Sequence, residues 1–237
     1  MTLSGLSLNW FIGQLHPLHP GFWLLLSFVL SGLTLLAERF LPGKFVGRLR
    51  IGRWIFTPYL GLLVGGLSPR LLGLSDIDWV AGLGLGVGLI FAIWLLLALV
   101  QTTLHREERA SESERLVGRS LLEQVVWAGS QEFHWAFLRG AVWEMLLALP
   151  SPPALPGYWA IWLASLLALP GIFVQHRHTA QRVIAGMLLI TTAILFFYTR
   201  NFFLCWLLHA SAGLFVGTGE IRSHSQEQSS GQRVPQR

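Results

Sequence analysis

Seven long, mostly apolar runs divide this chain and restrict it to a small set of folds. A helix needs about 20 predominantly apolar residues to cross the hydrocarbon core of a bilayer. Only 12% of the 237 residues are charged, against about 25% in a typical soluble domain. The sequence therefore predicts an all-α, polytopic transmembrane helix bundle of about seven spans. The expected spans are Gly21–Leu36, Trp54–Leu72, Trp79–Leu104, Leu121–Leu149, Gly157–Gln175, Arg182–Tyr198 and Asn201–Gly217.

Two of these runs contain residues that disturb or specialise a helix. Pro58 and the sequence Ser68-Pro69-Arg70 interrupt the second run, and proline removes a helical hydrogen bond. We therefore expect a kinked or re-entrant segment there. The third run has glycine at every second position from Gly82 to Gly88. Small residues let membrane helices approach closely, so these glycines predict a helix-packing face.

Lysine and arginine are distributed unevenly among the connections between the runs. Cytoplasmic loops of membrane proteins carry the excess of these residues. Fourteen of the 17 fall in alternate connections and the tail, two fall in the other connections, and Arg139 lies within a span. The alternation predicts an N-terminus outside and a C-terminus in the cytoplasm. The fourteen are Arg39, Lys44, Arg48, Arg50, Arg53, Arg106, Arg109, Arg115, Arg119, Arg177, Arg182, Arg222, Arg233 and Arg237.

Charge and cysteine content narrow the classes of partner and cofactor. The membrane topology accounts for the formal net charge of +5, so we expect the lipid bilayer as a partner and no nucleic acid. The single cysteine, Cys205, lies in an apolar run, which excludes a disulfide framework and a cysteine-based metal site. No motif identifies a cofactor, and the His-Glu-x-x-His zinc signature is absent.

The sequence divides into three regions. Residues 1–117 hold the N-terminal spans and a linker, and the mixed charges of residues 105–120 predict a surface helix in the cytoplasm. Residues 118–218 hold the remaining spans. Residues 219–237 are rich in serine, glutamine and arginine. They have nothing to bury and predict a disordered cytoplasmic tail.

Ionisable residues concentrate in the fourth run, where Glu132, His134 and Arg139 lie inside the predicted span. Such groups are costly in a membrane and usually face the bundle interior or a water-filled cavity. Glu132 and Arg139 are two helical turns apart, so we expect each to have its partner on another helix. His209 in the last run and His176 at the end of the fifth are further candidates. The pattern is compatible with a structural polar network or with a catalytic site.

The second half of the chain resembles a family of intramembrane proteases. A glycine-led helix from Ile184, then Phe197-Tyr198, a short polar turn and His209 resemble motifs of the CAAX-protease and bacteriocin-processing (CPBP) family. Arg139-Gly140 resembles the end of that family's Glu-Glu-x-x-x-Arg motif. The resemblance covers roughly residues 118–217 and implies a CPBP-like core. It implies candidate catalytic residues at Glu132, His134, Arg139, His176 and His209.

The sequence departs from the family's motifs at the residues that would perform the chemistry. His134 and Trp135 stand at the two glutamate positions, and Gly213 stands where the last motif has asparagine. The family's chemistry, as the resemblance implies it, uses a glutamate and histidines to activate a water against a peptide carbonyl. A general base must accept a proton within reach of that water, which Trp135 cannot do. We expect a divergent member whose peptidase activity is weak or absent, with Glu132 as the remaining candidate carboxylate.

Three functions stay open as alternatives. The first is an intramembrane peptidase with a peptide substrate. The second is a non-catalytic scaffold, assembly factor or regulator of another membrane protein, since fold membership does not establish activity. The third is a haem- or pigment-binding membrane subunit with His134 and His209 as axial ligands, which a visible absorption band would reveal.

The predicted topology is testable with reporter fusions. Fusions after Arg53, Arg119 and Arg237 should report the cytoplasm, because these residues belong to the arginine-rich side. Fusions near Ser151 and Arg200 should report the outside. A cytoplasmic signal at Ser151 would contradict the predicted orientation.

Overall fold

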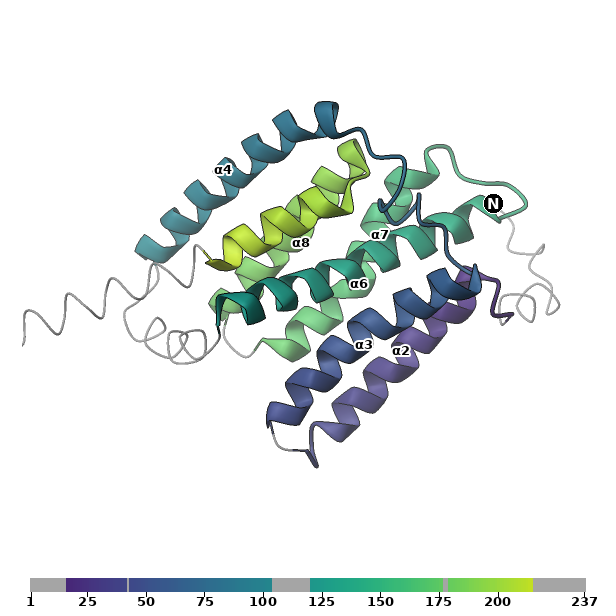
Figure 1. Ribbon diagram of the computed structural model, residues 1–237, viewed down its shortest axis with the longest axis horizontal. Helices are drawn as coiled ribbons and strands as arrows, with labels where there is room; N and C mark the ends of the chain where they lie inside the picture. The colour runs from purple at the N-terminus through teal and green to yellow at the C-terminus, as the bar shows by residue number, and fades with distance from the viewer. Residues whose placement is uncertain (1–15, 42, 104–119, 177–178, 215–237) are drawn as a thin grey trace, which may run out of the picture.

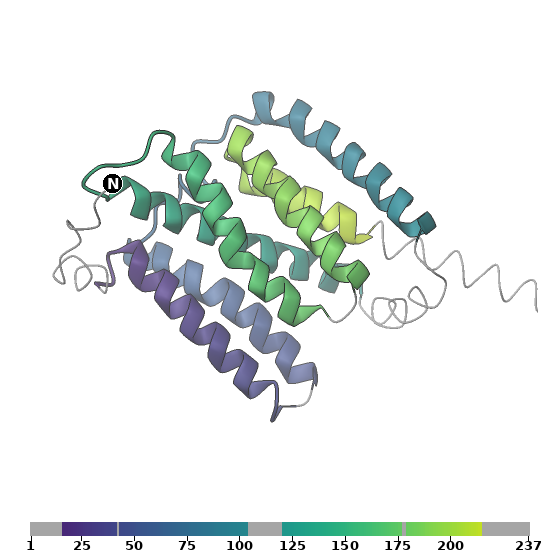
Figure 2. The same ribbon diagram turned by 180° about the vertical axis from the view of Figure 1, so that it is seen from behind.

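The chain folds into a bundle of helices that run side by side in alternating directions (Figures 1 and 2). A computed structural model describes residues 16–41, 43–103, 120–176 and 179–214. These ranges contain seven helices and no strand, so the predicted all-helical class is confirmed. The helices are α2 (Pro20–Ala37), α3 (Gly43–Val64), α4 (Trp79–Thr103), α6 (Leu121–Leu147), α7 (Pro156–Gln175), α8 (Thr179–Thr199) and the last helix (Phe202–Leu214).

Four of these helices are long and apolar enough to cross a membrane: α2, α4, α7 and α8. The chain is therefore a multi-pass membrane protein in a lipid bilayer. Helices α3 and α6 and the last helix do not meet the same criterion of length and hydropathy. Several arginines lie in the first half of α3, Glu132 and Arg139 lie in the middle of α6, and the last helix is shorter.

The predicted bounds of the second span, Trp54–Leu72, are wrong. The helix there is α3, which begins at Gly43 rather than Trp54 and ends at Val64 rather than Leu72. It begins early because arginine and lysine are good helix formers, so Arg50 lies on a helix and not in a connection. Pro58 is inside the helix and does not end it. Neighbouring helices make such a proline tolerable in a membrane bundle.

The segment between α3 and α4 contacts helices that are distant in the sequence. Gly73 has a positive φ of 74°, and an added Cβ there would lie 2.8 Å from the carbonyl oxygen of Arg200. Its own carbonyl accepts a hydrogen bond of 3.0 Å from the backbone N–H of Phe202. The backbone N–H of Ser68 donates to Oε1 of Glu144 on α6, at 2.7 Å. Glycine is required at residue 73 because other residues would be strained and crowded there.

Helix α6 lies at the centre of the bundle (Figure 1). It begins with a capping box, in which the Ser120 hydroxyl accepts from the backbone N–H of Glu123 and the Glu123 carboxylate accepts from that of Ser120. Such a box satisfies two backbone donors that a helix start leaves free. The helix packs against α2, α3 and α7. The predicted tail at 219–237 and nearly all of the predicted surface helix at 105–120 lie outside the described residues.

Two of the four glycines of α4, Gly82 and Gly86, form a packing face. An added Cβ would lie 2.9 Å from a methyl carbon of Leu204 at Gly82 and 3.3 Å from one at Gly86. At Gly84 and Gly88 it would meet nothing within 4 Å. Since Leu204 belongs to the last helix, one side of α4 packs closely against that helix, as small residues allow.

A matched pair of substitutions tests this face. Gly86→Leu should lower the free energy of unfolding in detergent by about 1–3 kcal/mol, because the added side chain overpacks the contact with Leu204. Gly84→Leu should change it by less than about 0.5 kcal/mol. Equal losses in the two variants would contradict this packing.

Candidate functional site

Glu132 and Arg139 form an ion pair inside the bundle. Nη1 of Arg139 donates to Oε1 of Glu132 at 2.8 Å, and the two side chains are 1% and 0% exposed. The expectation that two helical turns keep these residues from pairing with each other is wrong. Residues seven apart lie on nearly the same stripe of a helix. A helical side chain tilts toward the N-terminus, so Arg139 extends back to Glu132 over two turns.

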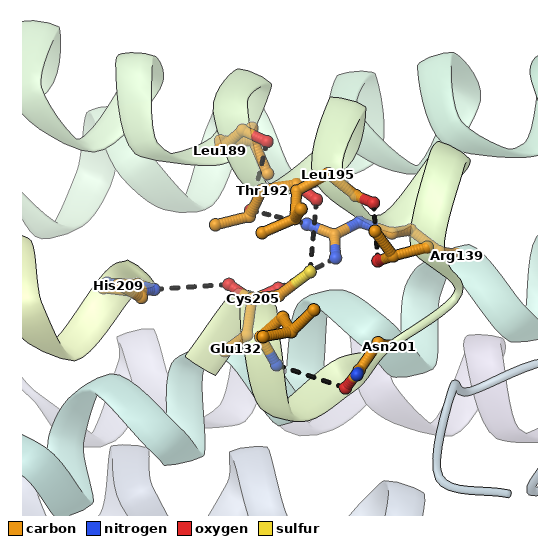
Figure 3. A network of polar contacts seen from close by, with 10 residues as sticks. Glu132, Arg139, Leu189, Thr192, Leu195, Asn201, Cys205 and His209 are labelled. Atoms are coloured by element: carbon orange, nitrogen blue, oxygen red, sulfur yellow. Dashed lines mark hydrogen bonds and ion pairs between the residues drawn. The ribbon is translucent and has the colours of Figure 1, made fainter. Parts of the chain in front are cut away.

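Both members of the pair also bond to other helices, as predicted (Figure 3). Nη2 of Arg139 donates to the Thr192 hydroxyl on α8 at 2.8 Å. Oε2 of Glu132 lies 3.3 Å from Nδ1 of His209 on the last helix. The guanidinium also lies over the ring of Phe196, 5.3 Å from its centroid. We call Glu132, Arg139, Thr192 and His209 the buried network.

The ion pair of the buried network is shielded from solvent. Each carboxylate oxygen of Glu132 has a protein partner, and the side chain has no exposed surface. Nδ1 of His209 can complete the network as the donor to Oε2 of Glu132. A general base needs a water within hydrogen-bond reach. The arrangement pairs charges that the membrane interior would otherwise penalise.

Trp135 separates the buried network from a pocket on the opposite face of α6. Its ring stacks on the imidazole of His209, with centroids 5.0 Å apart and planes 25° from parallel. The same ring lines the pocket. The residue at one of the family's glutamate positions is therefore the wall between His209 and that space.

The pocket lies among α2, α3, α6 and α7 and encloses about 240 Å³. His134 lines it, and its buried Nδ1 has no hydrogen-bond partner in the described part of the chain. The two histidines proposed as a pair therefore lie in different places, since His209 belongs to the buried network. The polar side chains that line the pocket are Ser27, Ser31, Glu38, Arg50, Arg53, Gln131, His134 and Gln175.

His176 lies at the end of α7 as its C-cap, outside both the buried network and the pocket lining. Its carbonyl accepts from Nε of Arg182 at 2.9 Å. Burial lowers the pKa of His176, and the nearby charge of Arg50 adds to this, while a hydrogen bond to the Gln181 side chain opposes it. A neutral imidazole at physiological pH follows from that direction. His178, the other histidine of this segment, lies outside the described residues.

Sequence reasoning missed several residues of both sites. Thr192 is one of two adjacent threonines in an apolar run, and only its contact with Arg139 distinguishes it. Asn201 is fully buried, and its Oδ1 accepts from the backbone N–H of Leu204 at 3.2 Å. An asparagine just before an apolar run is an N-cap signal, so this role was readable. Arg50 and Arg53 were assigned to a connection and not to a site, because α3 was expected to begin later.

The site residues do not identify a cofactor. Within the described ranges, no three side chains of His, Cys, Asp or Glu gather in a way that could hold a metal ion. Comparisons with protein-family models, with curated proteins and with solved structures find no match. The likeness to CPBP proteases therefore depends on the motif residues themselves.

Substitutions at Arg139 and His134 should differ sharply in cost. Arg139→Met should lower the free energy of unfolding by about 3–5 kcal/mol, because it leaves the buried charge of Glu132 uncompensated. His134→Gln should change it by less than about 1 kcal/mol, because the Nδ1 atom has no bond to lose. Unfolding in mixed detergent micelles measures both. A tolerated Arg139→Met would contradict the structural role.

Proposed function

We propose that this chain is a divergent CPBP-like membrane protein whose peptidase activity is weak or absent, and that it acts as a scaffold or regulator of another membrane protein. One observation carries the proposal. Trp135, at a motif glutamate position, stacks on His209 and lines the pocket. An indole ring thus occupies the place from which a carboxylate could serve both the histidine and a water in the pocket, and an indole is not a base.

Glu132 does not replace the missing carboxylate in this proposal. It lies one turn before Trp135 and does reach His209. However, it is absent from the pocket lining and its other oxygen is bonded to Arg139. His134 does face the pocket, yet it has neither Glu132 nor His209 beside it to complete a catalytic set. The remaining parts of the motif therefore favour structure over chemistry.

The proposal includes seven spans, with the N-terminus outside and the C-terminus in the cytoplasm. The positions of the helix junctions and the distribution of arginine support this topology. One end of the bundle holds the α2–α3 junction, the α7–α8 junction, the end of α4 and the start of α6 (Figures 1 and 2). The other junctions lie toward the opposite end. The arginine-rich connections are those of the first end. Helices α3 and α6 and the last helix would cross with their polar groups turned inward.

The haem or pigment alternative gains no support from the geometry. His209 has its Nδ1 near Glu132 and its ring against Trp135. His134 lines a pocket whose lining does not include His209. The two imidazoles do not face each other across one space in the described residues, as axial ligands of one ring would.

A peptidase assay of the purified protein tests the proposal. We expect no cleavage of membrane-peptide substrates above the background of a Glu132→Ala/His134→Ala double variant, because Glu132 does not line the pocket and Glu38, the one acidic side chain that does, is paired with Arg50. An active CPBP protease in the same detergent is the positive control. Cleavage by the wild type that His134→Ala or Glu132→Ala abolishes, with helicity and melting temperature retained, would overturn it.

A further inference from the structure

The pocket contains polar atoms that the protein itself leaves unbonded. Nε of Arg53 and Nδ1 of His134 are both buried, and neither has a hydrogen-bond partner among the described residues. Both residues line the pocket. Buried polar groups in proteins nearly always have partners, so two unbonded nitrogens on residues that line one space indicate a ligand that supplies acceptors.

The charge of the pocket selects an anion. Glu38 is the one acidic side chain among the lining residues. Its Oε1 is bonded to Nε of Arg50 at 2.7 Å, and one carboxylate among two guanidinium groups leaves the lining with a net positive charge. The guanidinium of Arg53 is further held near the ring of Trp54, 5.9 Å from its centroid. The unbonded Nε belongs to a planar guanidinium, whose donors match the geometry of phosphate oxygens.

The walls of the pocket open toward lipid. Helix α2 packs against α3 and α6, while α7 packs against α6 and α8, so the pocket lies where α2 and α7 face each other. Phe28 on α2 and Val174 on α7 both line it and are 42% and 50% exposed. In a membrane helix, exposed apolar side chains of this kind lie against acyl chains. A molecule in the pocket can therefore extend from its polar corner into the bilayer.

We propose that this pocket binds the headgroup of an anionic phospholipid, with Arg53 and His134 holding the phosphate and the acyl chains lying between α2 and α7. Basic pockets between transmembrane helices on the cytoplasmic side bind acidic headgroups. A volume of about 240 Å³ suits a headgroup and not a whole lipid. Assignment to the cytoplasmic leaflet rests on the proposed orientation. Binding itself does not depend on whether the chain cleaves peptides.

Lipid titration of the full-length protein in a neutral detergent, followed by native mass spectrometry, tests this site. Phosphatidylglycerol should bind more tightly than phosphatidylcholine with the same acyl chains. Arg53→Gln should raise the Kd for phosphatidylglycerol at least about fivefold. The matched control is Arg48→Gln, which removes the same charge from an exposed position on the same helix. It should raise that Kd less than about twofold.

A second variant keeps the proposal testable if Arg53→Gln fails to fold. Gly171 lines the pocket, and an added Cβ there would meet only Nε2 of Gln175, at 3.7 Å. Gly171→Leu should therefore fill the pocket, keep the melting temperature of the lipid-free protein and abolish selective binding of phosphatidylglycerol. Equal binding of the two lipids, or equal losses in Arg53→Gln and Arg48→Gln, would overturn the site. Inorganic phosphate that stabilises the protein as much as phosphatidylglycerol would show a free anion as the ligand and also overturn it.

Discussion

The ion pair between Glu132 and Arg139 determines how the helices of this protein's second half lie against one another. Neither charge is exposed, and an uncompensated charge in such a place costs several kcal/mol. Because Arg139 also bonds to Thr192 on α8 and Glu132 contacts His209 on the last helix, the pair fixes the register of three helices at once. A buried pair of this kind is weak evidence for added stability and better evidence for a specified arrangement.

The same helix serves a different purpose on its other face. His134 and Gln131 turn toward α2, α3 and α7 and line a pocket with a net positive charge. Trp135 closes the boundary between the two faces, stacked on His209 on one side and lining the pocket on the other. A helix with two polar faces needs neighbours on both, which is why α6 is the central helix and why so much of it is buried. The charges of one face are buried against neighbouring helices, and the other face lines the pocket.

Periodicity and composition predicted the helical class, the membrane and the concentration of polar residues in α6, because long apolar runs and buried charges are properties of the sequence itself. The start of α3 was predicted too late, because several arginines near a membrane boundary are typical of a connecting loop. Their apolar stems also suit a helix. The Glu132–Arg139 pair was missed because helix geometry alone ignores the reach of a long side chain. Thr192 and the unbonded Nε of Arg53 were beyond prediction, since each matters only through residues that are distant in sequence.

A double-mutant cycle on Glu132 and Arg139 tests the structural account most directly. The variants are Glu132→Met, Arg139→Met and the double substitution, each measured by its free energy of unfolding in mixed detergent micelles. The account predicts that either single variant is strongly destabilised and that the double variant is more stable than the sum of the two losses implies, with a coupling energy of about 2 kcal/mol or more. Additive losses, with a coupling energy near zero, would show that the pair does not hold these helices together.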